Sequence, residues 1–193
     1  VAEQSQKLLD AYRGRLSRER RYIGFLVGGD TKHFTLQPEA VRSALGQIKD
    51  AALRLDYDIL ITTSRRTSLE VERLLEKECK DFPRCKLLIN ARVDNPSYAL
   101  GGILGLSAIK VVSPESISMV SEAASCPGHV VVFGGRVDSR HDAFLRTLEH
   151  KGYIYRAPAA NIAGTIGFIH NKKPADKILN DIDTLGDCIR TVF

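Results

Sequence analysis

The chain has 193 residues, which at roughly 100–200 residues per domain corresponds to one domain, or to one domain with an appendage. Hydrophobic residues make up 44% of it and charged residues 26%, proportions that exclude the disordered, collagen-like and coiled-coil classes. No apolar run approaches the roughly 18–20 residues that spanning a bilayer requires, and the first residues lack the apolar core of a signal peptide. We therefore expect a cytoplasmic protein.

The net charge of +5 is concentrated at the start of the chain. Residues 1–21 hold more basic than acidic side chains and precede the first strand-like run. We expect a helical lead-in here, and three interpretations remain open. It is the connection from a preceding N-terminal domain, a basic segment that meets a membrane surface or another anionic partner, or simply a solvated helix face.

Six short runs rich in β-branched residues alternate with longer amphipathic segments, which is typical of βαβ units around a parallel sheet. Most of the runs are continuously apolar, and this indicates burial on both faces of the sheet. The predicted strands are Tyr22–Val27, Asp58–Thr62, Lys86–Ile89, Ile109–Val112, His129–Phe133 and Tyr153–Tyr155.

The segments between these runs predict helices. Pro38 precedes an apolar stripe of helical spacing, Ser68 is expected to cap the next helix, and Ser113 is expected to cap the helix after the fourth strand. Other helices are predicted to begin at Asn95-Pro96, where the helix would end in the glycines at 101–105, at Asp138, and at Ile178 near the end of the chain.

With right-handed crossovers, these elements give an α/β fold: a Rossmann-like, doubly wound parallel sheet of six strands in the order 3-2-1-4-5-6. In such sheets ligands bind beyond the carboxyl ends of the strands, at the switch point between the first and fourth strands. The loops that follow the strands are therefore the candidate site.

Gly28 and Gly29 follow the first strand, where glycine allows the backbone to approach a ligand closely, and Lys32 could face a phosphate. The loop lacks both the G-x-G-x-x-G fingerprint and the Gly-Lys-Ser/Thr ending of a P-loop. A nicotinamide-dependent dehydrogenase and a P-loop nucleotidase are therefore both disfavoured.

Hydroxyl and guanidinium groups follow the second strand, where Ser64 and Arg65 are suited to phosphate or ribose oxygens. Asn95, in the loop after the third strand, could hold a base or ribose edge. The alternative is structural: the hydroxyls cap a helix, the arginines are solvated, and Asn-Pro is an ordinary helix-start signal.

Small polar residues at the start of the helix after the fourth strand predict an anion site. Ser116, Ser118 and Met119 lie where free backbone amides and the helix dipole would hold a diphosphate. Glu122 lies about one turn further on, where its carboxylate could accept hydrogen bonds from two ribose hydroxyls. Alternatively, the serines are helix caps and Glu122 is a surface carboxylate.

Other classes of site find little support in the sequence. The histidines and the four cysteines show no metal-ligand spacing, so no metal is expected. No arrangement typical of nucleophilic catalysis is recognisable, and the catalytic residues stay undefined. Nucleic-acid binding is disfavoured because no RNA-binding aromatic motif is present and the loop charges are mixed.

Several of these segments together resemble one protein family. The stretches GGDTKHF, ITTSRRT and DNPSYALGGILGLSAIKVVSPESISMVSEAA, with the strand VVVF, resemble the glycosyltransferase-like family that is named for a plant mitochondrial fission protein. Bacterial members of that family are labelled nucleoside-diphosphate-sugar epimerases. The resemblance covers about residues 22–170.

The resemblance implies the C-terminal half of a GT-B glycosyltransferase fold, which has two Rossmann-like domains. Residues 1–21 would then connect to an absent N-terminal domain, residues 22–170 would bind a nucleotide-sugar donor without any cofactor, and residues 171–193 would form a C-terminal helix. The isolated domain would be inactive. Two alternatives stay open: a non-catalytic interaction module and a non-hydrolysing sugar-nucleotide epimerase.

Overall fold

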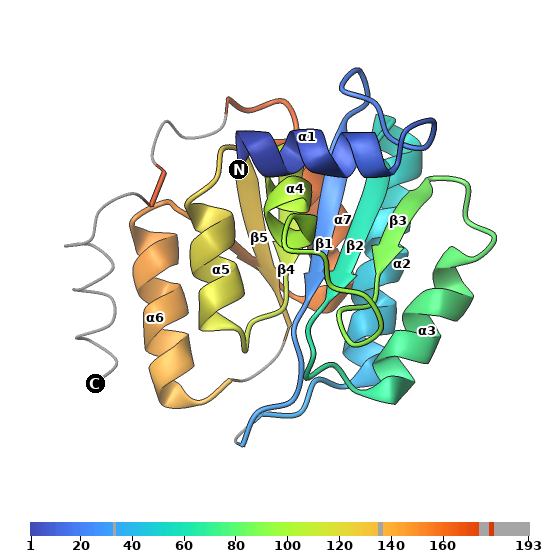
Figure 1. The fold of residues 1–193 in the computed structure, drawn as a ribbon. Helices are drawn as coiled ribbons and strands as arrows, with labels where there is room; N and C mark the ends of the chain where they lie inside the picture. The colour runs from blue at the N-terminus through green and yellow to red at the C-terminus, as the bar shows by residue number, and fades with distance from the viewer. Residues whose placement is uncertain (33, 135–136, 174–177, 180–193) are drawn as a thin grey trace.

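One six-stranded sheet lies at the centre of the computed structural model, which describes residues 1–32, 34–134, 137–173 and 178–179 (Figure 1). Every neighbouring pair of strands is parallel, and the order is β3-β2-β1-β4-β5-β6. The predicted fold class and strand order are confirmed. The strands are β1 (Tyr22–Val27), β2 (Asp58–Thr63), β3 (Cys85–Ile89), β4 (Ser107–Val112), β5 (His129–Phe133) and β6 (Tyr155–Ala157).

The predicted position of the last strand is wrong by two residues. β6 starts at Tyr155 because Tyr155–Ala157 pairs with Val131–Phe133 of β5. Tyr153 instead donates its backbone N–H to the carbonyl of Leu148 at 2.9 Å and so belongs to the turn that ends the preceding helix. The pairing partner, which a single sequence does not reveal, determines the register.

Helices cover both faces of the sheet (Figure 1). α2, α3 and α7 pack on one face with the apolar side chains of β1 and β2, and α4, α5 and α6 pack on the other, where α1 lies across α4. The helices are α1 (Ala2–Ala11), α2 (Pro38–Leu55), α3 (Leu69–Cys79), α4 (Ala99–Leu106), α5 (Ile117–Ala124), α6 (Ser139–His150) and α7 (Ile162–Ile169), with a short 3-10 helix at Ala159–Asn161.

Most of the predicted helix starts are confirmed. α2 begins at Pro38, the Ser68 hydroxyl accepts the N–H of Val71 at 3.3 Å, and the Asp138 carboxylate caps α6. The helix predicted from Ile178 lies outside the described residues, apart from residues 178–179. None of the helices in the described part of the chain is long and apolar enough to cross a bilayer.

The prediction that Ser113 caps α5 is wrong. The cap is Ser116, whose hydroxyl accepts the N–H of Met119 at 3.4 Å. Ser113 is held in the interior, because its hydroxyl accepts the N–H of Gly28 at 2.7 Å and donates to the Glu115 carboxylate at 2.9 Å. A serine that finds two buried partners is not available to cap a helix.

α4 also differs from the prediction, since it begins at Ala99 and contains the glycines that were expected to end it. These glycines form the contact with α1. A Cβ on Gly102 would lie 2.8 Å from the Cβ of Leu8 and 2.9 Å from the carbonyl oxygen of Gln4, so the two helices could not approach as closely. The role of these glycines is therefore to allow α1 and α4 to pack closely, and not to end the helix.

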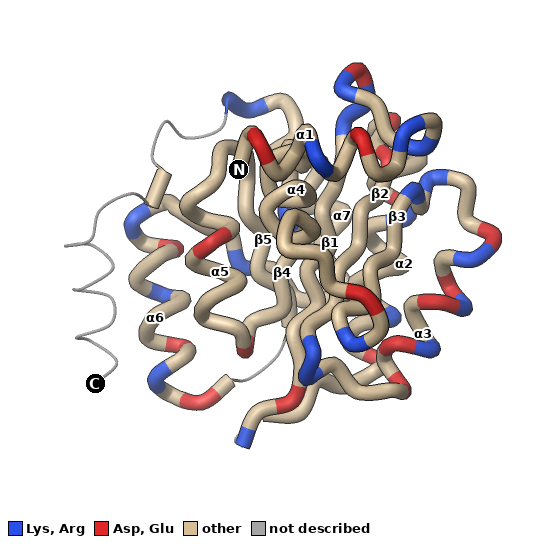
Figure 2. Tube along the Cα trace, in the orientation of Figure 1, with Lys and Arg blue, Asp and Glu red and all other residues tan. Residues whose placement is uncertain are grey.

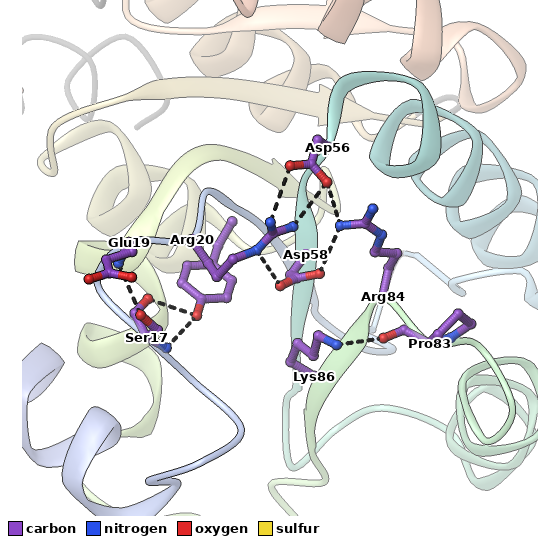
Figure 3. A network of polar contacts seen from close by, with 9 residues as sticks. Ser17, Glu19, Arg20, Asp56, Asp58, Pro83, Arg84 and Lys86 are labelled. Atoms are coloured by element: carbon purple, nitrogen blue, oxygen red, sulfur yellow. Dashed lines mark hydrogen bonds and ion pairs between the residues drawn. The ribbon is translucent and has the colours of Figure 1, made fainter.

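The segment after α1 is fastened to the sheet by an ion-pair network (Figure 3). Arg20 bridges Asp58 at 3.0 Å and Asp56 at 3.1 Å, and Arg84, just before β3, contacts the same two carboxylates. Hydrogen bonding to Arg20 lowers the pKa of Asp56. Residues 1–21 therefore form part of the packed structure, whatever precedes them.

Candidate functional site

The loops after β1, β2 and β4 are joined by buried hydrogen bonds at the carboxyl edge of the sheet. The hydroxyl of Thr67 donates to the carbonyl of Gly28 and accepts the N–H of Ser64 at 2.9 Å. The backbone N–H of Asp30 donates to the carbonyl of Arg66 at 3.2 Å. The backbone N–H of Gly28 donates to the hydroxyl of Ser113, in the loop after β4, at 2.7 Å. Together these bonds fix the relative position of the three loops at the predicted switch point.

A cavity of about 230 Å³ opens beside these loops. It brings together four of the predicted site residues: Ser64, Arg65, Asn95 and Met119. They come from the loops after β2 and β3 and from the first turn of α5. The remaining lining residues are Thr62, Thr63, Arg66, Ala91 and Leu100.

The cavity residues differ in how they are held. Ser64 is half-buried, and its hydroxyl accepts the N–H of Arg66 at 3.1 Å. Met119 is 8% exposed and forms an apolar wall. Arg65 is exposed and makes no hydrogen bond or ion pair with any described residue, so its guanidinium is available to an anion at the mouth of the cavity. Asn95 is exposed as well.

The other predicted residues at α5 do not line the cavity. The hydroxyls of Ser116 and Ser118 are 3.4 Å apart, the first buried and the second exposed. Glu122 is exposed on α5, and desolvation of its carboxyl group raises its pKa. Lys32 is exposed on the loop after β1. Figure 2 shows basic and acidic positions mixed along the loops at this edge.

Gly28 and Gly29 are buried, and protein atoms occupy the space that a side chain would need. A Cβ on Gly28 would overlap the carboxylate of Glu115, and a Cβ on Gly29 would overlap the backbone of Arg66 and Thr67. The absence of a side chain at Gly28 therefore allows contact with Glu115 in the loop after β4, and at Gly29 it allows contact with the loop after β2.

Glu115, which is only 3% exposed, was not among the residues predicted for the site. Burial raises the pKa of its carboxyl group, against the smaller effects of the backbone amides of Glu115 and Gly29 and the hydroxyl of Ser113, and its Oε2 has no hydrogen-bond partner among the described residues. No motif marks this residue. The only available signal was its position, two residues after Ser113 and close to the end of the central strand β4.

A second cavity of about 280 Å³ lies further along the carboxyl edge, between α6 and the ends of β5 and β6. Pro114 and Gly134 line it, together with Glu149 and Arg156. Arg156 is paired with Asp142 at 2.8 Å. The glycine and arginine that follow Gly134 lie outside the described residues.

Nearly the whole chain matches one known protein family. The sequence profile of the family Mitochondrial fission ELM1 matches residues 2–192. The chain belongs to this family. The expected resemblance is confirmed and extends beyond residues 22–170 at both ends, so α1 is part of the family pattern. No curated protein matches the chain significantly.

Solved GT-B glycosyltransferases share the fold at low sequence identity. The NMR structure of ALG13 matches with a TM-score of 0.55 and 14% identity, over 83% of this chain and 92% of that one. Trehalose-6-phosphate synthase from E. coli, bound with UDP-2-fluoro glucose, matches with a TM-score of 0.56 and 12% identity, over 98% of this chain and 46% of that one. A UDP-forming α,α-trehalose-phosphate synthase from Burkholderia vietnamiensis matches with a TM-score of 0.52 and 10% identity, over 97% and 43%. The chain thus spans less than half the length of these synthases.

Proposed function

We propose that this chain binds the nucleoside-diphosphate-sugar donor of a GT-B-type glycosyltransferase. The observation that carries the proposal is the cavity beside the switch point, where Ser64, Arg65 and Asn95 converge on the first turn of α5. This is the place where doubly wound sheets bind ligands. The E. coli synthase with the same fold is bound with UDP-2-fluoro glucose, which supports the ligand class.

The diphosphate would lie between Arg65 and the N-terminus of α5. Arginine binds phosphate oxygens with two parallel hydrogen bonds, and Arg65 has no competing partner in the described part of the chain. Ser116 and Ser118 add hydroxyls beside the free backbone amides of the helix, where the dipole favours negative charge. Lys32 would extend the positive surface toward the sugar phosphate.

The nucleoside would occupy the side of the cavity formed by Asn95 and Met119. The amide of Asn95 can donate to and accept from a base edge, while the sulfur-containing side chain of Met119 provides an apolar contact. Glu122 is placed one turn beyond Ser118, where its carboxylate would accept hydrogen bonds from the ribose hydroxyls.

In the intact enzyme, transfer would depend on stabilising the departing nucleoside diphosphate. Arg65 and the α5 dipole supply fixed positive charge for this purpose, so the proposal requires no cofactor or metal. The acceptor would be bound by a second domain, as the half-length match to the synthases suggests. This chain alone is expected to bind a donor without transferring its sugar.

Saturation-transfer NMR with UDP, GDP, ADP, CMP and their sugars tests the proposal, since half of a divided site can bind as weakly as millimolar, about −4 kcal/mol. Arg65→Gln should abolish the signal of the nucleotide that binds. Arg73→Gln, which removes an exposed arginine on α3, is the matched control and should leave it unchanged.

The role of Glu122 is tested by comparing the bound nucleotide with its 2′-deoxy form. The unaltered chain should prefer the ribonucleotide, and Glu122→Ala should lose that preference. No binding to any nucleotide, or equal losses in Arg65→Gln and Arg73→Gln, would overturn the proposal. An unchanged ribose preference in Glu122→Ala would remove the role of Glu122 alone.

A further inference from the structure

A third cavity, of about 370 Å³, lies at the opposite edge of the sheet, where β1, β4 and β5 begin. Its wall is formed by the α4–β4 junction and by the turn at Pro127-Gly128. Four basic side chains from three parts of the chain complete it, and none of its lining residues, all of which are described, is an Asp or Glu. The four are Arg21, His129, His170 and Lys172.

The basic groups are held in place by aromatic rings and backbone carbonyls. The guanidinium of Arg21 lies 4.3 Å from the centre of the Tyr57 ring, and it donates to the Tyr57 hydroxyl and to the carbonyl of His170 at 3.2 Å. The ammonium of Lys172 lies 3.4 Å from the centre of the Phe168 ring. Cations oriented in advance lose less conformational entropy when an anion binds.

Two histidines line the cavity. His129 is only 7% exposed, and its Nε2 lies 3.1 Å from the carbonyl oxygen of Lys172. The Nδ1 of His170 is buried and has no hydrogen-bond partner among the described residues. A buried polar atom without a partner is costly, and a ligand that supplied one would remove that cost.

Two carboxylates at this edge are already paired with arginines. Asp56 and Asp58 are bridged by Arg20 and Arg84, as Figure 3 shows. They are therefore not free to pair with Arg21. Among the residues that the structure describes, no carboxylate lines the cavity to balance its positive charge.

A further cation lies behind the wall of the cavity. Lys110 of β4 is fully buried, and its ammonium donates to the carbonyls of Cys126, at 3.1 Å, and of Pro127, which lines the cavity. A buried charge is screened less than an exposed one, so Lys110 adds to the positive potential. Figure 2 shows that the segment after α7 is also basic at this edge.

We propose that this cavity binds a phosphate group, either on a small soluble molecule or on a lipid headgroup. Phosphate presents several acceptor oxygens at once, which suits a guanidinium, an ammonium and an imidazole arranged around one space. The cavity is at the other edge of the sheet from the donor cavity and shares no residue with it, so the two proposals stand or fall separately.

Titration of the ¹⁵N-labelled chain with inorganic phosphate, followed by amide chemical shifts, tests the soluble source. The amides of Gly128, His129 and His170 should shift and saturate. Lys172→Gln should weaken binding by about fivefold, since an exposed cation is lost, and His170→Phe by about tenfold, since a ring of similar size without nitrogen is left. Lys173→Gln is the matched control and should bind as the unaltered chain does.

Sedimentation with phosphatidylcholine vesicles, with and without phosphatidic acid, tests the lipid source. Binding that requires phosphatidic acid and is lost in Lys172→Gln, but not in Lys173→Gln, would identify a headgroup site. The proposal is overturned if neither probe binds, or if both lysine variants lose binding equally. It is also overturned if phosphate shifts only amides near Ser64 and Met119, which would instead indicate the donor site.

Discussion

A single missing Cβ allows the loops after β1 and β2 to meet. Replacing Gly29 by Ala would place that atom within the backbone of Arg66 and Thr67, which cannot move aside as a side chain can. We expect Gly29→Ala to lower the free energy of unfolding by about 1–3 kcal/mol, measured by urea denaturation. Gly46→Ala, on α2 with open space around it, should instead raise it by about 0.5–1 kcal/mol. Equal effects of the two changes would contradict this account.

Glu115 should make stability depend on pH. Burial raises the pKa of its carboxyl group above the ordinary 4.5, so the folded chain holds this proton more tightly than the unfolded chain does. The stabilising contribution is complete below about pH 4.5 and is lost as the pH rises through the folded-state value. Glu115→Gln keeps an acceptor for the Ser113 hydroxyl but carries no charge.

Glu115→Gln should therefore gain stability relative to the unaltered chain as the pH rises from 4 to 8, as measured by urea denaturation at each pH. Glu76→Gln, which removes an exposed carboxylate from α3, controls for the change in net charge. A pH-independent difference between Glu115→Gln and the unaltered chain would show that the carboxyl group is not perturbed by burial.

Glu115 shows why the residues of the candidate site could be predicted only in part. Ser64, Arg65, Asn95 and Met119 were found because they follow strands whose carboxyl ends must meet in a parallel sheet, and the structure brings them to one cavity. Glu115 lies in the same region but was overlooked, because the burial of its carboxylate depends on Gly28, which lies in a loop distant in the sequence. Local sequence does not encode that packing.

At the scale of elements, α1 behaves as part of the core rather than as a separate lead-in. Leu8 is fully buried, in one cluster with Tyr22, Leu60 and Ile103. Leu8→Ala should lower the free energy of unfolding by about 2–5 kcal/mol, because it leaves a cavity between α1 and α4. Leu53→Ala, on the exposed face of α2, should change it by less than about 0.5 kcal/mol. A small effect at Leu8 would mean that α1 contributes little to stability.

The bounds of helices and strands could be predicted where they depend on neighbouring residues. They could be predicted less well where they depend on a contact with a residue distant in the sequence. Pro38, Ser68 and Asp138 start helices by interactions within a few residues, and all three were recognised. Ser113 has the same local appearance as a cap but binds a distant amide, that of Gly28. The glycines of α4 were assigned to the end of a helix because their partner, α1, is about a hundred residues away in the sequence.

For the whole molecule, the parallel sheet creates two chemically different edges. At the carboxyl edge, Arg65 is exposed beside a cavity that several loops form. At the amino edge, a basic cavity remains after Arg20 and Arg84 have neutralised Asp56 and Asp58. The sequence predicts a candidate ligand site at the first edge, because sheets of this topology bind ligands beyond the carboxyl ends of their strands. The second depends on which charges are paired, and this becomes visible only in three dimensions.

Lys110, in the central strand β4, should make the free energy of unfolding of the whole molecule depend on pH in the alkaline range. Burial lowers the pKa of its ammonium from 10.5 to about 8. Between these values the unfolded chain binds more protons than the folded chain, so this residue makes the free energy of unfolding rise with pH. Below about pH 8 both states are protonated, and the cost of burying the charge is constant.

Lys110→Met keeps a similar volume in β4 and removes the titrating group. Its two carbonyl acceptors at Cys126 and Pro127 lose their donor at every pH, so the informative quantity is the slope. From pH 7.5 to 10.5 the stability of the unaltered chain should rise by about 3 kcal/mol relative to that of Lys110→Met, measured by urea denaturation. Lys77→Met, which removes an exposed lysine from α3, should run parallel to the unaltered chain. If the free energy of unfolding of Lys110→Met also ran parallel to that of the unaltered chain across this pH range, the pKa of the buried ammonium would not be lowered. Burial of Lys110 in β4 would then have no pH-dependent effect on stability.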